Sequence, residues 1–433
     1  MSDDERQAWV VVDLGFGDAG KGSITDFLVR ESRASLVVRF NGGAQAGHTV
    51  VDTDGRRHIF SQFGAGSFVP AVETLLGPDF LLHPGGMDVE ARHLERIGVD
   101  DAWKRTFIDE RVRVISPFQQ AGGRLREVAR AERAHGTCGL GVGECVDDSL
   151  RYPQDTLHAR DLGDITRLRR ALRAQRDRKR EELRGLFLEN CVAARQELRV
   201  FDDSTLIGRI VEQWRRGSTR MRVLAADETD DLLRQHGRTV FEGAQGVLLD
   251  QDFGFHPHTT WSDCTPRPAL RLLEGLDARV HRIGVSRTYA TRHGRGPLPT
   301  ESPSLTEQLP EVDGDDSSQG RFRVGALDGV LLRYACAIVG GLDGIALTCL
   351  DRTASVVHVC EEYSGAQGET IARIEAPLAT DFLGREQLTE RLRRSHARTT
   401  TTDDVVAWVE NITGVPVIVE SWGERAADKR WRR

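Results

Sequence analysis

The stretch WVVVDLGFGDAGKGSITDFLV, residues 9–29, gives the strongest indication of the fold class of this chain. Residues 9–12 form an apolar run of strand character, residues 15–23 contain four glycines, and residues 24–28 have the apolar spacing of a helix. Glycines in such a loop allow backbone N–H groups to close around phosphate oxygens, and the following helix N-terminus adds positive partial charge. The stretch therefore predicts a strand, a phosphate-binding loop and a helix.

The spacing of this loop matches the P-loop pattern in part. Gly15, Gly20 and Lys21 fit the pattern, and the lysine is expected to reach the outer phosphates of a bound nucleotide. Gly22, however, stands where a hydroxyl residue normally binds Mg²⁺. The loop is thus a P-loop-like phosphate cradle, and an ordinary glycine-rich turn is the alternative interpretation.

Asp18 places a carboxylate inside the same loop. An anion beside phosphates is unfavourable unless a metal ion bridges the two or the carboxylate takes part in the chemistry. Asp18 is therefore the first catalytic candidate.

Composition excludes several classes of function. The chain has 433 residues, of which 39% are hydrophobic and 29% charged, and its net charge is −7. This composition is typical of a globular protein, and the charge gives no general attraction to nucleic acid or anionic lipid. No run approaches the roughly 18 to 20 apolar residues that cross a bilayer, and the first ten residues are too polar for a signal peptide. We expect a cytoplasmic protein that binds neither nucleic acid nor membranes.

The order of apolar and helical segments predicts an α/β fold. A second buried strand is expected at residues 35–40, so that the first 40 residues form a βαβ unit whose loops meet at the carboxyl edge of a sheet. We expect a large, mostly parallel central sheet flanked by helices. The length would allow two or three domains, but large α/β sheets often form one unit. We predict a single domain over residues 1–433, with a helical excursion around residues 161–235.

A second glycine-rich loop, residues 41–49, follows the second predicted strand. Because both loops should lie at the same sheet edge, His48 is a candidate for an acid or a phosphate-stabilising group beside the cradle. A solvated or structural histidine is the alternative.

Polar residues further along the chain suit the recognition of small ligands. Gln245 lies between small residues, and its amide can donate and accept at the edge of a 6-oxopurine. Arg321 and Arg323 can each bind a carboxylate through two hydrogen bonds, as a dicarboxylate such as aspartate requires. Asp351, at the end of a predicted buried strand, can accept hydrogen bonds from guanine and so select GTP over ATP. A surface glutamine and a solvated basic loop are the alternatives for the first two.

Five motifs resemble the signature sequences of the adenylosuccinate synthetase family, GTP-dependent ligases that join aspartate to inosine monophosphate. They are GFGDAGKG at 15–22, GGAQAGHT at 42–49, HGTCGLGVG at 135–143, FEGAQGVLLD at 241–250 and TRHGRGPLPTE at 291–301. The resemblance spans nearly the whole chain.

The resemblance implies a reaction through a 6-phosphoryl intermediate, with an adenylosuccinate-type product, GDP and phosphate. It implies that Asp18, His48, Lys21 and Gln245 are catalytic, that Mg²⁺ binds at Asp18 and Gly47, and that the protein is a homodimer. The implied GTP contacts are Gly17, Gly20, Lys21, Gly22, Gly47, His48, Thr49, Asp351, Ser421 and Gly423. The implied acceptor-nucleotide contacts are Gln45, Thr137, Cys138, Arg151, Gln245, Thr260, His293 and Arg321, and the aspartate contacts are Ser318, Arg321 and Arg323.

Several residues depart from the family motifs. Gln45 replaces an asparagine, Cys138 a threonine and His293 a valine, all near the acceptor nucleotide, and Cys349 replaces a lysine that packs on guanine. We therefore expect either an enzyme that acts on IMP or a paralogue that uses another oxopurine or purine-like nucleotide. A catalytically inactive nucleotide-binding protein and a P-loop kinase are the remaining alternatives.

Overall fold

A computed structural model describes residues 5–186, 192–309, 320–353 and 356–432. One predicted site residue, Ser318, lies outside the described residues. Among the described helices, none has the combination of length and apolar character that a membrane crossing requires.

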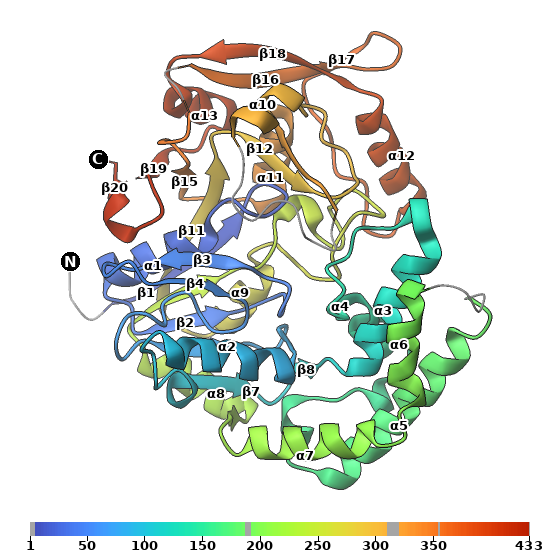
Figure 1. The fold of residues 1–433 in the computed structure, drawn as a ribbon. Coiled ribbons are helices and arrows are strands. Elements are labelled where there is room, and N and C mark those ends of the chain that lie inside the picture. The colour runs from blue at the N-terminus through green and yellow to red at the C-terminus, as the bar shows by residue number, and fades with distance from the viewer. Residues whose placement is uncertain (1–4, 187–191, 310–319, 354–355, 433) are drawn as a thin grey trace.

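The centre of the molecule is a ten-stranded sheet with the order β20-β19-β15-β11-β1-β10-β2-β5-β7-β9 (Figure 1). Every neighbouring pair in it is parallel except the edge pair of β19 and β20. This arrangement confirms the predicted α/β class. The strands are β1 (Arg6–Asp13), β2 (Leu36–Arg39), β5 (Glu73–Leu76), β7 (Thr106–Asp109), β9 (Arg222–Leu224), β10 (Arg238–Glu242), β11 (Ala278–Arg287), β15 (Gly344–Thr348), β19 (Val417–Ser421) and β20 (Lys429–Trp431).

Consecutive residues of β1 are apolar because both faces of the sheet are covered, so that side chains on either side of the strand are buried. Val10 and Val12 point into one hydrophobic core, and Val11 points into another on the opposite face. Helix α1 (Lys21–Ser32) packs Ile24 and Phe27 into the core that contains Val11. The predicted strand, loop and helix thus occur in that order, with the helix beginning at Lys21.

A group of helices stands at one side of the sheet (Figure 1). It contains α3 (Pro117–Arg130), α4 (Val142–Arg151), α5 (Ile165–Glu182), α6 (Val192–Asp202) and α7 (Leu206–Ser218). Strand β9 returns the chain to the sheet edge before α8 (Ala226–Gln235). The predicted helical segment around residues 161–235 is therefore interrupted by one strand of the central sheet.

Smaller units surround the sheet. A second sheet has β16 (Val357–Ser364) in its middle, paired with β14 (Leu327–Asp328), β17 (Thr370–Ile371) and β18 (His396–Thr402). Three two-stranded units are β3 (His48–Val51) with β4 (Arg57–Phe60), β6 (Leu81–Leu82) with β8 (Arg113–Val114), and β12 (Ala290–His293) with β13 (Phe322–Gly325). Further helices are α2 (Pro84–Arg96), α9 (Arg267–Leu273), α10 (Pro303–Gln308), α11 (Gly329–Val339), α12 (Phe382–Arg393) and α13 (Val405–Thr413).

The loops that follow β1, β2, β10, β11, β15 and β19 leave the same edge of the sheet, because these strands are parallel. The loop after β1 and the loop after β10 touch most closely at Gly246. A Cβ atom at Gly246 would lie 2.1 Å from the carbonyl oxygen of Gly15 and 2.4 Å from the backbone nitrogen of Gly17. Only glycine allows the two loops to meet in this way.

We predict that Gly246→Ala lowers the free energy of unfolding by about 1–3 kcal/mol, because one of the two loops must move away. Gly208→Ala is the matched control. Gly208 lies within α7 with no atom near an added Cβ, so alanine there should be neutral or stabilising by about 0.5–1 kcal/mol. Urea unfolding of both variants measures the difference, and a Gly246→Ala protein as stable as the parent would contradict the packing described here.

Candidate active site

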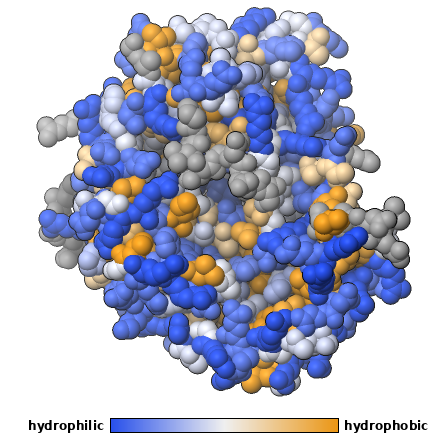
Figure 2. All heavy atoms as spheres, in the orientation of Figure 1, coloured by the Kyte–Doolittle hydropathy of each residue, from blue (hydrophilic) through white to orange (hydrophobic). Residues whose placement is uncertain are grey.

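A cleft of about 1500 Å³ opens where the sheet edge faces the helical group. Figure 2 shows the molecule hollowed near its centre, with both hydrophilic and hydrophobic residues around the hollow. Most of the predicted site residues line this one cleft. They are Gly17, Asp18, Gly20, Lys21, Gly22, Gln45, Gly47, His48, Thr49, Thr137, Cys138, Arg151, Gln245, Thr260 and His293.

The phosphate-binding loop is wrapped around the buried carboxylate of Asp13. One oxygen of Asp13 accepts hydrogen bonds from the backbone N–H groups of Gly15 and Gly17, at 2.8 and 3.3 Å. The other oxygen accepts from the N–H of Ala19 at 3.0 Å and from Nζ of Lys21 at 2.9 Å. Asp13 was not predicted as a site residue; the available signal was a carboxylate directly after a buried apolar strand.

Asp18 sits at the tip of this loop with its side chain 39% exposed and lining the cleft. Its backbone has a left-handed conformation, with φ of 60°. The guanidinium of Arg287, at the end of β11, donates a hydrogen bond to the carbonyl oxygen of Asp18. The carboxylate is thus presented to the cleft by a backbone that is itself held in place.

His48 is oriented by a buried carboxylate. Its Nδ1 lies 2.5 Å from Oε1 of Glu242 at the end of β10, and the other oxygen of Glu242 accepts from the N–H of Ala65 at 2.9 Å. Burial lowers the pKa of His48 to about 4, despite the favourable charge of Glu242. Burial opposes ionisation of Glu242, but the charge of Arg39 and the contacts with His48 and Ala65 hold its pKa below the usual value.

His48 is therefore neutral near pH 7, with its Nδ1–H donated to Glu242 and Nε2 as the acceptor atom of the ring. Glu242 was part of a quoted motif, but its pairing with His48 was not predicted. The two residues are 194 positions apart, so no local pattern could indicate the contact.

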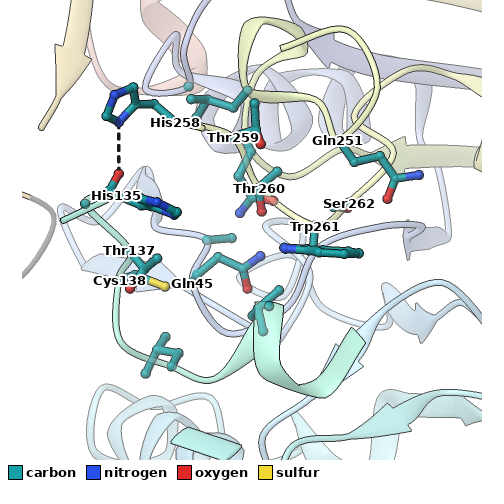
Figure 3. A pocket seen from close by; sticks show the side chains of 18 of the residues that line it. Gln45, His135, Thr137, Cys138, Gln251, His258, Thr259, Thr260, Trp261 and Ser262 are labelled. Atoms are coloured by element: carbon teal, nitrogen blue, oxygen red, sulfur yellow. Dashed lines mark hydrogen bonds between the residues drawn. The ribbon is translucent and has the colours of Figure 1, made fainter. Parts of the chain in front are cut away.

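Two amide side chains in the cleft have unpaired atoms. Both amide atoms of Gln45, and Oε1 of Gln245, are buried without a hydrogen-bond partner among the described residues. Buried polar atoms are normally paired, so these amides indicate a place for water or a ligand. Figure 3 shows Thr137 and Cys138 on the loop before α4, and Trp261 on a separate segment of the same pocket. Trp261, 45% exposed, was not predicted.

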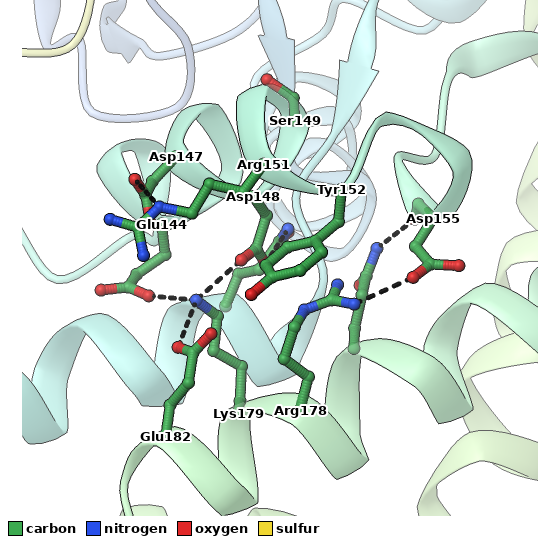
Figure 4. Close-up of polar contacts among 12 residues, drawn as sticks. Glu144, Asp147, Asp148, Ser149, Arg151, Tyr152, Asp155, Arg178, Lys179 and Glu182 are labelled. Atoms are coloured by element: carbon green, nitrogen blue, oxygen red, sulfur yellow. Dashed lines mark hydrogen bonds and ion pairs between the residues drawn. The ribbon is translucent and has the colours of Figure 1, made fainter.

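The helix that carries Arg151 is fixed from below by a buried lysine (Figure 4). Nζ of Lys179 on α5 lies 2.6 Å from Glu144 and 2.8 Å from Asp148, both on α4. Burial opposes the charge of Lys179, but these carboxylates raise its pKa above the usual value. Arg151 itself has a largely exposed side chain that pairs with Asp147 at 3.0 Å. Its predicted reach across a dimer stays a prediction.

The predicted guanine-binding residues lie next to the cradle but outside the lining of the cleft. The backbone N–H of Leu350 donates to the carbonyl oxygen of Ser421 at 3.1 Å, which brings the loop containing Asp351 against the loop containing Ser421 and Gly423. Oγ1 of Thr348 donates to the carbonyl oxygen of Ala19 at 2.7 Å. The ends of β15 and β19 are thus tied to the phosphate-binding loop.

The predicted aspartate-binding arginines also lie outside the cleft lining. Arg321 is exposed, whereas Arg323 donates to a carboxylate oxygen of Glu301 at 2.8 Å and to the carbonyl oxygen of Gly296 at 2.8 Å. A different arginine, Arg292, does line the cleft.

Arg292 is 2% exposed and its guanidinium lies 4.0 Å from the ring centroid of Phe16. It donates to the carbonyl oxygens of Pro297 and His258 at 3.0 and 3.2 Å. Burial lowers the pKa of Arg292 well below its usual value. The prediction missed this residue, although it stands in the quoted motif at residues 291–301.

Comparison with known proteins identifies the family. The family model described as adenylosuccinate synthetase matches residues 10–429. The chain belongs to the adenylosuccinate synthetase family. Members of this family are GTP-dependent ligases that form C–N bonds, which confirms the resemblance and the predicted enzyme class.

Relatives cover most of the chain. Adenylosuccinate synthetase of Myxococcus xanthus (strain DK1622) is 31% identical over 435 residues, 96% of each chain. That of Anaeromyxobacter sp. (strain K) is 36% identical over 351 residues, 79% of this chain and 76% of the relative. The fully ligated adenylosuccinate synthetase of Plasmodium falciparum has the same fold, with a TM-score of 0.78 at 18% identity, and covers 98% and 99% of the two chains.

Three residues of the cleft depart from the adenylosuccinate synthetase motifs. Gln45, Cys138 and His293 all line it. Burial raises the pKa of the Cys138 thiol, so that this side chain is a neutral group near pH 7. These three side chains therefore differ in size or in hydrogen-bonding groups from the residues of the family motifs.

The pKa of His48 leads to a prediction about stability. Because the folded-state pKa of about 4 lies below the roughly 6.5 of an unfolded histidine, the unfolded chain binds the proton first. The contribution of neutral His48 to the free energy of unfolding is complete above pH 6.5, and it is lost as the pH falls towards 4. The free energy of unfolding, measured in urea, should decrease between pH 7.5 and pH 5 in both proteins. The decrease should be about 2 kcal/mol smaller in His48→Gln than in the parent. Equal losses in both proteins would contradict the neutral, buried state of His48.

Proposed function

We propose that the protein joins the amino group of L-aspartate to carbon 6 of an oxopurine nucleotide, IMP or a close analogue, at the expense of GTP. The observation that carries this proposal is the Asp18 carboxylate, which faces the cleft from within a phosphate-binding loop. Family membership supports the same reaction. We further propose a cytoplasmic homodimer, in which Arg151 contributes to the neighbouring subunit's site.

The chemistry requires activation of the 6-oxo group, because oxide is a poor leaving group. Asp18 accepts the N1 proton of the heterocycle, oxygen 6 attacks the γ-phosphorus of GTP, and GDP leaves with the electrons of the broken P–O bond. The amine of aspartate then attacks carbon 6 and loses a proton, and phosphate leaves with the electrons of the C–O bond. The two steps together form one C–N bond and release GDP and phosphate.

The neighbouring residues support this sequence of steps. Neutral His48 donates Nδ1–H to Glu242, so its Nε2 is the acceptor that would take up a proton before it could donate to a phosphate. Lys21 adds positive charge at the base of the loop. The unpaired amide oxygen of Gln245 suits the N–H edge of a purine ring.

The oxygen atoms at the cleft also fit Mg²⁺. Asp18 supplies a carboxylate and Gly47 a backbone carbonyl, and both residues line the cleft. Mg²⁺ is usually held by one or two carboxylates together with substrate phosphates. Among the described residues no group of three or more His, Cys, Asp or Glu side chains could hold a metal alone, so the phosphates would complete the site. Bound there, Mg²⁺ would neutralise charge on the phosphates.

We assign the recognition of guanine and of aspartate to residues near the edge of the sheet. Asp351, Ser421 and Gly423 would bind guanine beside the cradle, with Cys349 in place of a lysine. Arg321 and Arg323, with Ser318, would bind aspartate after the Arg323 guanidinium exchanges Glu301 for the substrate.

A paralogue acting on another purine nucleotide is the second candidate, because Gln45, Cys138 and His293, which depart from the family motifs, all line the cleft. Another solved structure with this fold is the cyanophage S-2L succinoaminodeoxyadenylate synthetase, bound to dGMP and to dATP as an energy donor, with a TM-score of 0.54 and 16% identity over 99% and 95% of the chains. Deoxynucleotide acceptors and ATP therefore belong in the test.

The test incubates the protein with Mg²⁺, aspartate, GTP or ATP, and a panel of IMP, GMP and their deoxy analogues. We expect phosphate release only when the triphosphate, aspartate and one of the oxopurine nucleotides are all present, with a succinyl adduct detected by mass spectrometry. A stable phosphoester without aspartate would indicate a kinase instead. Binding without any phosphate release would contradict the proposed ligase.

Asp18→Asn keeps the size of the side chain but removes the base. We expect acceptor-dependent phosphate release to fall by at least about 100-fold while the protein unfolds at the same temperature as the parent. Asp54→Asn is the matched control, because the side chain of Asp54 is 76% exposed on the surface. Near-parental turnover in Asp18→Asn would exclude Asp18 as the base.

A further inference from the structure

His293 contacts Asp18 from a separate strand. Its Nε2 lies 3.4 Å from Oδ2 of Asp18, and the two side chains are 23% and 39% exposed. Asp18 belongs to the loop after β1, and His293 ends β12. The pairing therefore depends on the tertiary fold and does not arise from local sequence.

The ring of His293 is held in place by the strand beside it. His293 is paired with Phe322 in the antiparallel register of β12 and β13. Their ring centroids are 4.8 Å apart with an interplanar angle of 62°, an edge-to-face contact that restricts rotation of the imidazole. Nε2 is the ring nitrogen that lies near Asp18, 3.4 Å from Oδ2.

The surroundings of the second nitrogen select the tautomer. Nδ1 of His293 is buried, and it has no hydrogen-bond partner among the described residues. A proton on Nδ1 would be an unpaired buried donor, whereas a proton on Nε2 can be donated to the Asp18 carboxylate. The neutral ring is therefore favoured as the Nε2–H tautomer.

We propose that His293 is a positioning residue for Asp18: its Nε2–H donates to Oδ2 and orients the carboxylate towards the heterocycle of the acceptor. This inference rests on the proposed function of Asp18 as the base. Arg287 fixes the backbone of Asp18 and His293 its side chain, so the short side chain is constrained at both ends. A contact of 3.4 Å is long for a hydrogen bond, and such contacts commonly shorten when substrate binds.

Two amide variants separate a donor at Nε2 from a donor at Nδ1. The amide nitrogen of glutamine can reach the position of Nε2, whereas that of asparagine reaches only the position of Nδ1. We expect kcat of acceptor-dependent phosphate release to fall roughly 10- to 100-fold in His293→Val and His293→Asn. His293→Gln should recover most of that loss, and KM for GTP should stay within about twofold in all three. His358→Val, on an exposed position of β16, is the control for loss of a histidine.

Two kinetic outcomes would overturn the inference. One is parental kcat in His293→Val. The other is a loss that appears as a raised KM for the acceptor and is not recovered by glutamine, because that pattern assigns His293 to acceptor binding instead of to Asp18.

A second measurement does not depend on catalysis. In protein with ¹⁵N-labelled histidine, long-range proton–nitrogen spectra should show His293 as the Nε2–H tautomer, and Asp18→Ala should move its Nε2 resonance more than that of any other histidine. An Nδ1–H tautomer, or no response to Asp18→Ala, would overturn the contact. If the parent protein releases phosphate with no acceptor, the proposed function fails, and these spectra still decide whether His293 holds Asp18.

Discussion

The carboxylate of Asp13 is the constraint on which the site depends. It accepts three backbone hydrogen bonds from the loop after β1 and pairs with Lys21, all within the protein interior. Loss of one partner of such a buried ion pair typically costs about 3–5 kcal/mol. The same contacts hold the loop in one conformation, with the side chain of Asp18 exposed at its tip.

The carboxylates of Glu242 and Asp18 differ in their surroundings because they occupy different positions in the fold. Glu242 is fully buried and serves His48, whereas Asp18 stands at the loop tip with its side chain open to the cleft. One carboxylate therefore orients a neutral histidine, and the other is open to a ligand in the cleft. The difference follows from burial and neighbouring charges, and the two residues themselves have the same acidic group.

Much of the fold could be predicted from the sequence because the strands of a covered parallel sheet are continuous apolar runs, as in residues 9–12. The glycine-rich loops likewise indicated that Asp18 and His48 would lie at the same sheet edge, and both residues line the cleft. Asp13, Glu242 and the contact of His293 with Asp18 could not be predicted, because each depends on residues that only the tertiary structure brings near. Resemblance to a family suggested that His293 was unusual, but only the geometry links it to Asp18.

The central claim is that oxygen 6 of the acceptor becomes a phosphate ester before aspartate replaces it. The most direct test uses an acceptor nucleotide labelled with ¹⁸O at that position and follows the label through one complete reaction. We expect the released inorganic phosphate to carry the ¹⁸O. Unlabelled phosphate, with the ¹⁸O recovered in water, would contradict it.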